Sequence, residues 1–353
     1  MTPSIYNSSI RRLFYIYVGP WRDNAAGIKV LHYLCNVLNE TGNESYLVLN
    51  GGKRDQIAVN PHLNTPVLTK RQASLHRMQN RQPRVIYSET ISGNPLNANC
   101  VVRYFLNFPG ILGGSLEFPD VEMKVAYSQN IADSIDNPQG VLFLPAVDTD
   151  EIEQCKNKKG DYSLYYAGKY RAYVGKPFLP TDIQFEELPR INGKSTNRMD
   201  VLELIKGAKV LLVFENTTLA TEAILLGTPV VFMPNNFLGK IIAAQELGDE
   251  GSCIGYTENG LTYAIDTLEI AKVKYGHAVQ NFWSQLSDFL VNSDDFFARK
   301  QSLSSSNIRV PNLRASNALH KARLFSAATR NLGLSRAIAI ALNLNFRFIR
   351  RKN

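Results

Sequence analysis

Two glutamates flank the start of a short predicted helix, and their spacing suits ligand binding. Residues 208–214 are apolar and predict a buried strand, which Glu215 follows directly. A polar turn, a helix over residues 217–226 that contains Glu222, a Gly-Thr-Pro turn and a second buried strand over residues 230–233 come next. In such a unit the helix N-terminus lies at the carboxyl edge of a parallel sheet, where free backbone N–H groups favour an anion. We therefore expect a ligand that carries phosphate.

Two carboxylates would repel a phosphate, but they can accept hydrogen bonds from hydroxyl groups of the same ligand. A nucleotide sugar carries both. Its diphosphate would bind N–H groups at Thr217, Thr218 and Leu219, and Glu222 would accept charge-assisted hydrogen bonds from the ribose hydroxyls. The alternative is that Glu215 and Glu222 are ordinary acids at a helix start, where they complement the helix dipole. The residues alone leave both interpretations open.

The N-terminal part of the chain predicts a doubly wound α/β domain. Its first elements are an apolar strand over residues 13–18, a glycine-bearing turn, a helix over residues 28–39 and a strand over residues 46–49. This is the order in which such a domain begins. Further strands are expected over residues 84–87, 124–127 and 141–144, and a helix near residues 100–106. We assign residues 1–150 to this first Rossmann-like domain, because residues 148–160 are polar and rich in lysine, as in a linker.

A second α/β series occupies residues 151–295. Its strands are predicted over residues 163–167, 185–188, 208–214 and 230–233, and its helices over residues 199–206, 217–226 and 238–246. A chain of 353 residues is long for one core and natural for two domains. The predicted class is therefore α/β, with two Rossmann-like domains.

The basic character of the chain belongs to its C-terminal part. Net charge is +8, but no Asp or Glu follows Asp295, and 12 of the 39 Lys and Arg residues do. The preceding part carries 27 basic and 31 acidic residues, a net charge of −4. We expect residues 296–353 to form a basic helical tail, which either lies on an anionic membrane surface or closes the chain as a helix packed on the domains.

The remaining composition points to the cytoplasm. The four cysteines, at positions 35, 100, 155 and 253, show no paired spacing, so neither a disulfide framework nor a zinc site is suggested. The apolar stretch near the N-terminus is shorter than a signal-peptide core, and no apolar run reaches the length of a membrane span. We expect a cytoplasmic protein, with peripheral attachment at the inner membrane face if the tail binds lipid.

The segment from Glu215 to Val231, with its Glu-Asn-Thr-Thr and Gly-Thr-Pro-Val-Val stretches, resembles the donor-binding motif of B-type glycosyltransferases. The likeness extends over about residues 11–255 and is greatest for bacterial enzymes of O-antigen and capsule assembly. The resemblance implies two Rossmann-like domains facing a cleft. It also implies transfer of a hexosyl group from a nucleotide sugar to a glycan or lipid-linked glycan, with no cofactor besides the donor substrate.

The resemblance also implies roles for individual residues. Glu222 matches the glutamate that binds ribose, whereas Glu215 is one residue closer to it than in the family's common retaining pattern. A basic residue after the first strand of the second domain neutralises the diphosphate in this family; Lys169 is our choice and Arg171 the reserve. Base recognition is expected near residues 185–191. The full set of predicted donor-binding residues is Gly27, Lys169, Arg171, Arg190, Glu215, Asn216, Thr217, Thr218, Leu219 and Glu222.

Inversion at the sugar would require a general base, and the loops of the first domain offer Asp23, His32 and Glu89. Asp23 lies in the turn after the first strand and Glu89 follows a later strand, so we take these two as catalytic candidates. Asp23 is better explained as a turn-forming residue next to Asn24, and His32 as a residue packed in its helix. Gly27 either lets the backbone approach the diphosphate or is a plain helix-entry glycine.

The one Asp-x-Asp triplet, Asp148-Thr149-Asp150, lies in the predicted linker, and we do not expect it to be of the kind that carries a metal in other glycosyltransferases. We therefore predict metal-independent transfer, in which helix N–H groups and Lys or Arg offset the charge on the leaving diphosphate. Two other functions remain open. A nucleotide-sugar epimerase would turn over the donor without an acceptor. A non-enzymatic scaffold would use the basic tail on a membrane or nucleic acid, although the tail contains no recognised nucleic-acid module, and no nucleic-acid partner is expected.

Overall fold

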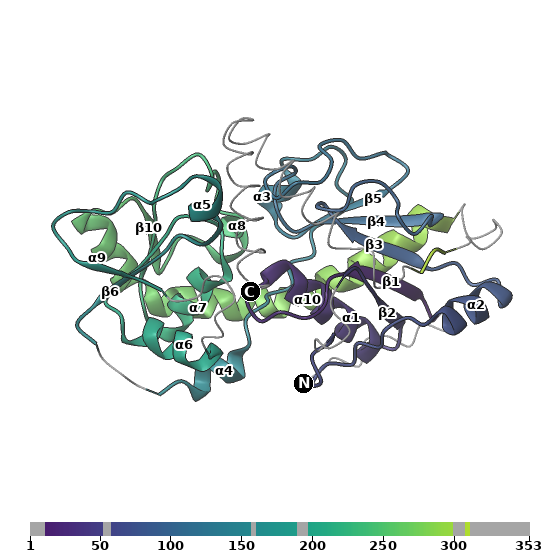
Figure 1. Ribbon diagram of the computed structural model, residues 1–353, viewed down its shortest axis with the longest axis horizontal. Helices are drawn as coiled ribbons and strands as arrows, with labels where there is room; N and C mark the ends of the chain where they lie inside the picture. The colour runs from purple at the N-terminus through teal and green to yellow at the C-terminus, as the bar shows by residue number, and fades with distance from the viewer. Residues whose placement is uncertain (1–10, 52–57, 157–159, 189–196, 299–307, 311–353) are drawn as a thin grey trace, which may run out of the picture. The chain divides into compact units, whose positions relative to one another are not determined.

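The computed structural model describes residues 11–51, 58–156, 160–188, 197–298 and 308–310, which form two compact α/β units (Figure 1). Among the described residues, unit 1 contains those up to Tyr127, Ile131–Leu144 and those from Trp283 to Val310, and unit 2 contains Ser128–Asn130 and Pro145–Phe282. The predicted tail lies almost wholly outside the described residues, as does Arg190. Each unit is built on its own parallel sheet, which confirms the predicted α/β class with two Rossmann-like halves.

Unit 1 has a five-stranded parallel sheet in the order β2-β1-β3-β4-β5. The strands are β1 (Leu13–Val18), β2 (Glu44–Leu49), β3 (Arg84–Ser88), β4 (Cys100–Phe105) and β5 (Met123–Ala126). The helices around them are α1 (Ala26–Glu40) and α2 (Lys70–Met78), and the short α3 (Gln129–Ala132) is divided between the two units. The inner strands are buried along their whole length and rich in Val, Ile, Tyr and Phe, as parallel strands covered on both faces should be.

Unit 2 repeats this arrangement with the order β10-β9-β8-β6-β7. Its strands are β6 (Ser163–Tyr166), β7 (Phe185–Glu187), β8 (Leu211–Val213), β9 (Val230–Phe232) and β10 (Ser252–Ile254). Its helices are α4 (Thr149–Gln154), α5 (Gly168–Tyr173), α6 (Arg198–Gly207), α7 (Thr218–Leu226), α8 (Ala244–Leu247) and α9 (Glu258–Asp266). In both units the first strand lies between the second and the third.

The 30-residue helix α10 (Leu268–Phe297) belongs to both units, because the division falls between Phe282 and Trp283. Its last part is held on unit 1 by charge. Asp294 accepts hydrogen bonds from Arg12 and Arg84, which lie just before β1 and at the start of β3. Burial raises the pKa of Asp294, but the two guanidinium groups outweigh it and lower the pKa below its usual range.

Three sequence predictions of local structure are wrong. Residues 100–106 were expected as a helix, but Cys100–Phe105 is strand β4, because Val, Tyr and Phe favour a pleated, doubly covered strand. Residues 141–144 form only an isolated bridge, Ala126 to Val141, rather than a strand. Of the helix expected over residues 238–246, only α8 forms. Asn216 explains this, because it holds residues 238–242 as a loop by three hydrogen bonds.

Arg103 is the residue that makes the β4 segment hard to predict as a strand from the sequence. A charged residue at the centre of an apolar run suggests a solvated helix face, yet Arg103 is 1% exposed. Its Nε and Nη2 donate to the carboxylate of Glu122 at 2.9 and 3.0 Å, and Nη1 donates to the carbonyl of Ile91 at 2.6 Å. The buried charge is therefore compensated inside unit 1, and Arg103 is a structural residue of that unit.

Candidate functional site

The candidate site lies where the strand order of unit 2 reverses. β6 pairs with β7 on one side and with β8 on the other, with Tyr166 opposite Val213. The segments leaving β6 and β8 therefore emerge side by side at the carboxyl edge of the sheet. In open parallel sheets this switch point is where ligands bind. The residues after β6 include Gly168 and Lys169, and those after β8 run from Glu215 to Leu219, so the fold brings together two segments that the sequence had assigned to donor binding.

Glu215 is directed into the protein and joins these two segments. The residue is 4% exposed, and its carboxylate accepts hydrogen bonds from the backbone N–H groups of Lys169 at 2.6 Å and Tyr170 at 3.3 Å. These N–H groups belong to the first turn of α5, so Glu215 satisfies donors that a helix start leaves unpaired. Glu215 thus fixes the position of Lys169 relative to the start of α7.

Gly168 makes this close approach possible. Its φ is +43°, a conformation that L residues rarely adopt, and a Cβ atom on it would lie 2.6 Å from Oε1 of Glu215. A glycine is therefore required at this position both by backbone conformation and by space.

Asn216 organises the loop that follows β9. Its amide nitrogen donates to the carbonyl oxygens of Leu238 and Lys240 at 3.1 and 3.0 Å, and its amide oxygen accepts from the N–H of Ile242 at 2.8 Å. All three bonds hold one segment, so the side chain of Asn216 fixes the loop of residues 238–242 relative to the start of α7.

The start of α7 offers two free backbone donors. The hydroxyl of Thr217 caps the helix by accepting from the N–H of Leu219 at 3.3 Å, and Leu219 itself is fully buried in the core of unit 2. Within the described part of the chain, the N–H groups of Thr217 and Thr218 have no acceptor. Of the three N–H groups expected to bind an anion, two are therefore available, at the positive end of the helix dipole.

Lys169 and Arg171 have different surroundings. Lys169 is exposed, one residue after the glycine turn. Arg171 donates through Nη2 to the hydroxyl of Tyr165 at 2.9 Å and forms an ion pair with Glu187 at 2.7 Å. The charge of Arg171 is thus already balanced by Glu187, whereas Lys169 presents its ammonium group to solvent. This geometry favours Lys169 over Arg171 as the cation for a diphosphate.

Glu222 lies on α7, is 1% exposed and is bound by an arginine. Arg198 donates from Nη1 and Nη2 to the two oxygens of Glu222 at 2.9 and 2.8 Å, and from Nε to Glu151 at 3.0 Å. Burial lowers the pKa of Arg198, but the hydrogen bonds and charges of Glu222 and Glu151 outweigh it and raise the pKa above its ordinary value. The group of three side chains carries one net negative charge. A ribose hydroxyl is a better partner for it than a phosphate.

Sequence reasoning missed Arg198 and Glu151. One signal was present: Arg198 is the first residue of α6, just after the capping residue Asn197, where a cation opposes the helix dipole. An arginine at that position needs a carboxylate partner. Nothing in the local sequence identified which of the chain's acids it would be.

The predicted residues of unit 1 lie at the corresponding switch point, between β1 and β3. Asp23 is exposed in the turn after β1, and its Oδ1 accepts from Nε1 of Trp21 at 2.7 Å. Glu89 follows β3, is 2% exposed and accepts from the N–H of Leu106 at 2.9 Å. Gly27 lies in the first turn of α1, where a Cβ would make only ordinary contact with Leu106, so packing does not require glycine there. Asp23 is thus the more accessible of the two catalytic candidates.

His32 is packed inside unit 1, as expected for a structural histidine. It is fully buried, its Nε2 lies 3.1 Å from the carbonyl oxygen of Gly19, and the ring of Trp21 packs edge-on against it at 5.3 Å. Burial lowers the pKa of His32, so the imidazole is neutral near pH 7.

The described residues contain neither a candidate metal site nor a helix that could span a membrane. No group of three or more His, Cys, Asp and Glu side chains in the described ranges could hold a metal ion. Within the same ranges, every helix is too short or too polar to cross a bilayer.

Comparisons with known proteins gave similarity to solved structures only. No family model matches the chain, and no curated protein matches it. A mutant O-GlcNAc transferase of Thermobaculum terrenum is similar with a TM-score of 0.47 and 14% identity, over 82% of this chain and 68% of that one. WaaG, a glycosyltransferase involved in lipopolysaccharide biosynthesis, has a TM-score of 0.39 and 12% identity, over 81% and 99%. The glycosyltransferase SnogD from Streptomyces nogalater has a TM-score of 0.38 and 10% identity, over 78% and 96%. These values do not place the chain in a family.

Proposed function

We propose that this protein is a glycosyltransferase that moves a hexosyl group from a nucleotide sugar to a glycan or lipid-linked glycan acceptor of a surface polysaccharide. One observation carries the proposal. At the switch point of unit 2, the free N–H groups of Thr217 and Thr218 lie beside a turn that presents Lys169, and Glu215 binds the two segments together. Helix N–H groups and an exposed cation at this edge are suited to a diphosphate.

The same groups supply the main requirement of glycosyl transfer. Departure of a nucleoside diphosphate develops negative charge on its β-phosphate, and donors fixed before the reaction stabilise that charge without reorganisation. Lys169 and the start of α7 meet this requirement without a metal ion. We expect transfer to continue in the presence of EDTA, and complete loss of activity that Mg²⁺ or Mn²⁺ restores would contradict this expectation.

Ribose recognition is assigned to Glu222. Its carboxylate accepts two hydrogen bonds from Arg198 and has further lone pairs, and the net negative charge of the cluster suits hydroxyl donors. Because Glu222 is buried, donor binding must be accompanied by a movement that gives the ribose access to it. Arg190 stays a prediction for the nucleobase.

If the reaction inverts the sugar, Asp23 is the proposed general base. It is exposed on the loop at the switch point of unit 1, whereas Glu89 is buried and bonded to the chain after β4. Asp23→Asn should then abolish transfer and leave donor binding unchanged. Unchanged transfer by this variant would remove Asp23 from the mechanism.

Titration calorimetry with UDP, GDP and dTDP, and with their sugars, tests the function directly. Binding of at least one of them, weakened by Lys169→Ala, is expected, followed by sugar transfer to an extract of lipid-linked glycans. Absence of binding to the whole panel would refute the proposal. Conversion of the donor without an acceptor would identify an epimerase instead. The predicted membrane role of the tail is tested by deleting residues 300–353 and measuring membrane association, which should fall.

A further inference from the structure

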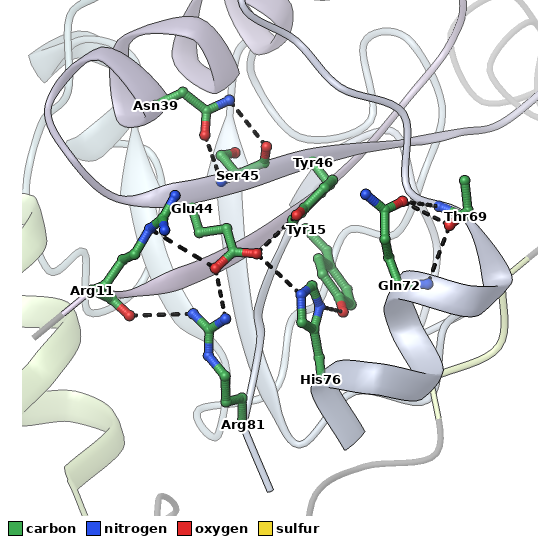
Figure 2. A network of polar contacts seen from close by, with 10 residues as sticks. All are labelled: Arg11, Tyr15, Asn39, Glu44, Ser45, Tyr46, Thr69, Gln72, His76 and Arg81. Atoms are coloured by element: carbon green, nitrogen blue, oxygen red, sulfur yellow. Dashed lines mark hydrogen bonds and ion pairs between the residues drawn. The ribbon is translucent and has the colours of Figure 1, made fainter. Parts of the chain in front are cut away.

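Helix α2 is pinned to the sheet of unit 1 through a buried histidine (Figure 2). His76 points from α2 toward the sheet and is 6% exposed. Its Nδ1 lies 2.6 Å from the hydroxyl of Tyr15 on β1, and its Nε2 lies 3.1 Å from Oε1 of Glu44 on β2. The hydroxyl of Tyr46 also donates to Glu44, at 2.8 Å. This network fixes which face of α2 is directed inward.

Both ends of α2 are fixed as well. Thr69 and Gln72 form a capping box, in which the N–H of Gln72 donates to the Thr69 hydroxyl at 3.1 Å and the N–H of Thr69 donates to the Gln72 side chain at 3.0 Å. Beyond the last turn, Nη1 of Arg81 donates to Oε2 of Glu44 at 2.6 Å. A helix of nine residues, marginal alone, is thereby held in one orientation.

The outward side of α2 combines cations with large apolar side chains. Lys70, Arg71 and Arg77 are exposed, and on the same helix Leu75 and Met78 are 41% and 71% exposed. Val67, just before the helix, is 38% exposed. Single exposed apolar residues are common on protein surfaces, but here they share one short helix with three cations.

This surface also lies in an acid-free part of the sequence. No Asp or Glu occurs between Asp55 and Glu89, although the chain before the tail carries a net charge of −4. This segment of the sequence therefore has a net positive charge. A partner that complements it must be anionic and must also accept apolar side chains.

We propose that the outward surface of α2, formed by Val67, Lys70, Arg71, Leu75, Arg77 and Met78, docks on an anionic phospholipid surface. Lipid headgroups attract the three cations, and the boundary of the acyl chains takes up Leu75 and Met78, as for an interfacial amphipathic helix. A nucleic acid would satisfy the cations but has no use for exposed Leu and Met side chains on the same helix. The proposal does not depend on the proposed function, since nucleotide binding belongs to unit 2.

The test is co-sedimentation of the full chain with vesicles of equal parts phosphatidylglycerol and phosphatidylcholine. Leu75→Glu with Met78→Glu should reduce binding at least about tenfold, through lost apolar burial. Lys70→Gln with Arg71→Gln should reduce it about 30-fold, because each Lys or Arg near an anionic surface contributes about 1 kcal/mol. Vesicles of phosphatidylcholine alone should bind the unaltered protein far more weakly.

Matched variants outside α2 test whether the loss of exposed apolar or charged side chains elsewhere on the protein also lowers vesicle binding. Leu116→Glu with Val121→Glu changes two apolar residues of unit 1 that are 61% and 63% exposed, and Lys156→Gln with Lys176→Gln removes two exposed charges of unit 2. Both pairs should retain most of the binding. All substituted residues are exposed, so unchanged circular dichroism and melting are expected and confirm folding.

Three outcomes would overturn the proposal. In the first, the α2 variants bind vesicles as well as their matched controls, which assigns membrane binding elsewhere, such as to the tail. In the second, the unaltered chain does not bind anionic vesicles. In the third, the unaltered chain binds a DNA or RNA duplex more tightly than vesicles, and the α2 charge variants lose binding to the duplex but keep binding to vesicles.

Discussion

Arg198 binds both carboxylate oxygens of Glu222, at 2.9 and 2.8 Å, and its third guanidinium nitrogen binds Glu151. The pair is buried, since the side chains of Arg198 and Glu222 are 12% and 1% exposed. It connects the start of α6 to α7, the helix whose N-terminus forms the proposed diphosphate site. The stability of unit 2 and the geometry of that site are therefore coupled through one ion pair.

Removing Arg198 should leave a buried carboxylate without a partner. We expect Arg198→Met to lower the free energy of unfolding by about 3–5 kcal/mol, measured by urea denaturation. The double variant Arg198→Met with Glu222→Leu should recover most of this loss, because no buried charge then remains unpaired. Equal stability of the single variant and the unaltered protein would show that the ion pair does not form in solution.

The ribose assignment of Glu222 predicts a change in selectivity. The unaltered protein should prefer a ribonucleoside diphosphate to its 2′-deoxy analogue, and Glu222→Gln should reduce this preference by about tenfold or more, because a charge-assisted hydrogen bond becomes a neutral one. The ratio of the two dissociation constants is measured by calorimetry. A general loss of structure would weaken both ligands alike, so an unchanged ratio would argue against contact with the 2′-hydroxyl.

Gly168 should be more sensitive to substitution than Gly227, a second glycine of unit 2 with positive φ. Gly168→Ala adds both an unfavourable conformation and a Cβ only 2.6 Å from Glu215, and we expect a loss of about 2–4 kcal/mol in the free energy of unfolding. Gly227 is the control: its φ is +88°, but a Cβ there would meet nothing within 4 Å, so Gly227→Ala should cost only about 1 kcal/mol. Equal losses, measured by urea denaturation, would show that the contact with Glu215 is unimportant.

Lys169 and Arg171 should differ in their effect on diphosphate binding. Lys169→Ala should weaken a nucleoside diphosphate about tenfold, because it removes a charge-assisted contact, and should leave stability unchanged. The uncharged nucleoside should bind both proteins alike. Arg171→Ala should affect stability by less than about 1 kcal/mol, since its partly exposed pair with Glu187 contributes little. A larger loss of diphosphate affinity in Arg171→Ala than in Lys169→Ala would reverse this assignment.

Unit 1 should lose stability in acid through the network around His76 and Glu44. Burial lowers the pKa of His76, with Glu44 opposing and Arg81 adding to the shift, so the folded state favours neutral imidazole. The unfolded chain binds this proton first as the pH falls below about 6.5, and stability falls with it. The pKa of Glu44 is lowered despite burial, because hydrogen bonds from Arg81 and Tyr46 outweigh it, so its contribution is lost as the pH falls further, below about 4.3.

Urea denaturation at several pH values measures this loss, whose slope cannot exceed about 1.4 kcal/mol per pH unit for the single proton of His76. His76→Gln should flatten the decline between about pH 7 and pH 5. The neighbours that face His76 are Tyr15, Glu44, Tyr46 and Arg81, and none of these four ordinarily changes charge in that interval. An unchanged slope would assign the acid sensitivity to other groups.

The sequence was sufficient to predict the α/β class, most strands of both sheets and the segments at the switch point of unit 2. These features follow from local signals: apolar runs of strand length, helical spacing and glycine turns. Long-range pairing decided the rest. Residues 100–105 became a strand because the sheet offered neighbours on both sides and Glu122 compensated Arg103.

The local sequence likewise did not determine the roles of Glu215 and Glu222. Glu215 turned inward because Lys169 and Tyr170, 46 and 45 positions earlier in the chain, place their N–H groups against it. Glu222 found Arg198, 24 positions away, because α6 and α7 pack together. The charge of a carboxylate can be read from one residue, but its partner depends on which distant segment the fold places within about 3 Å of it.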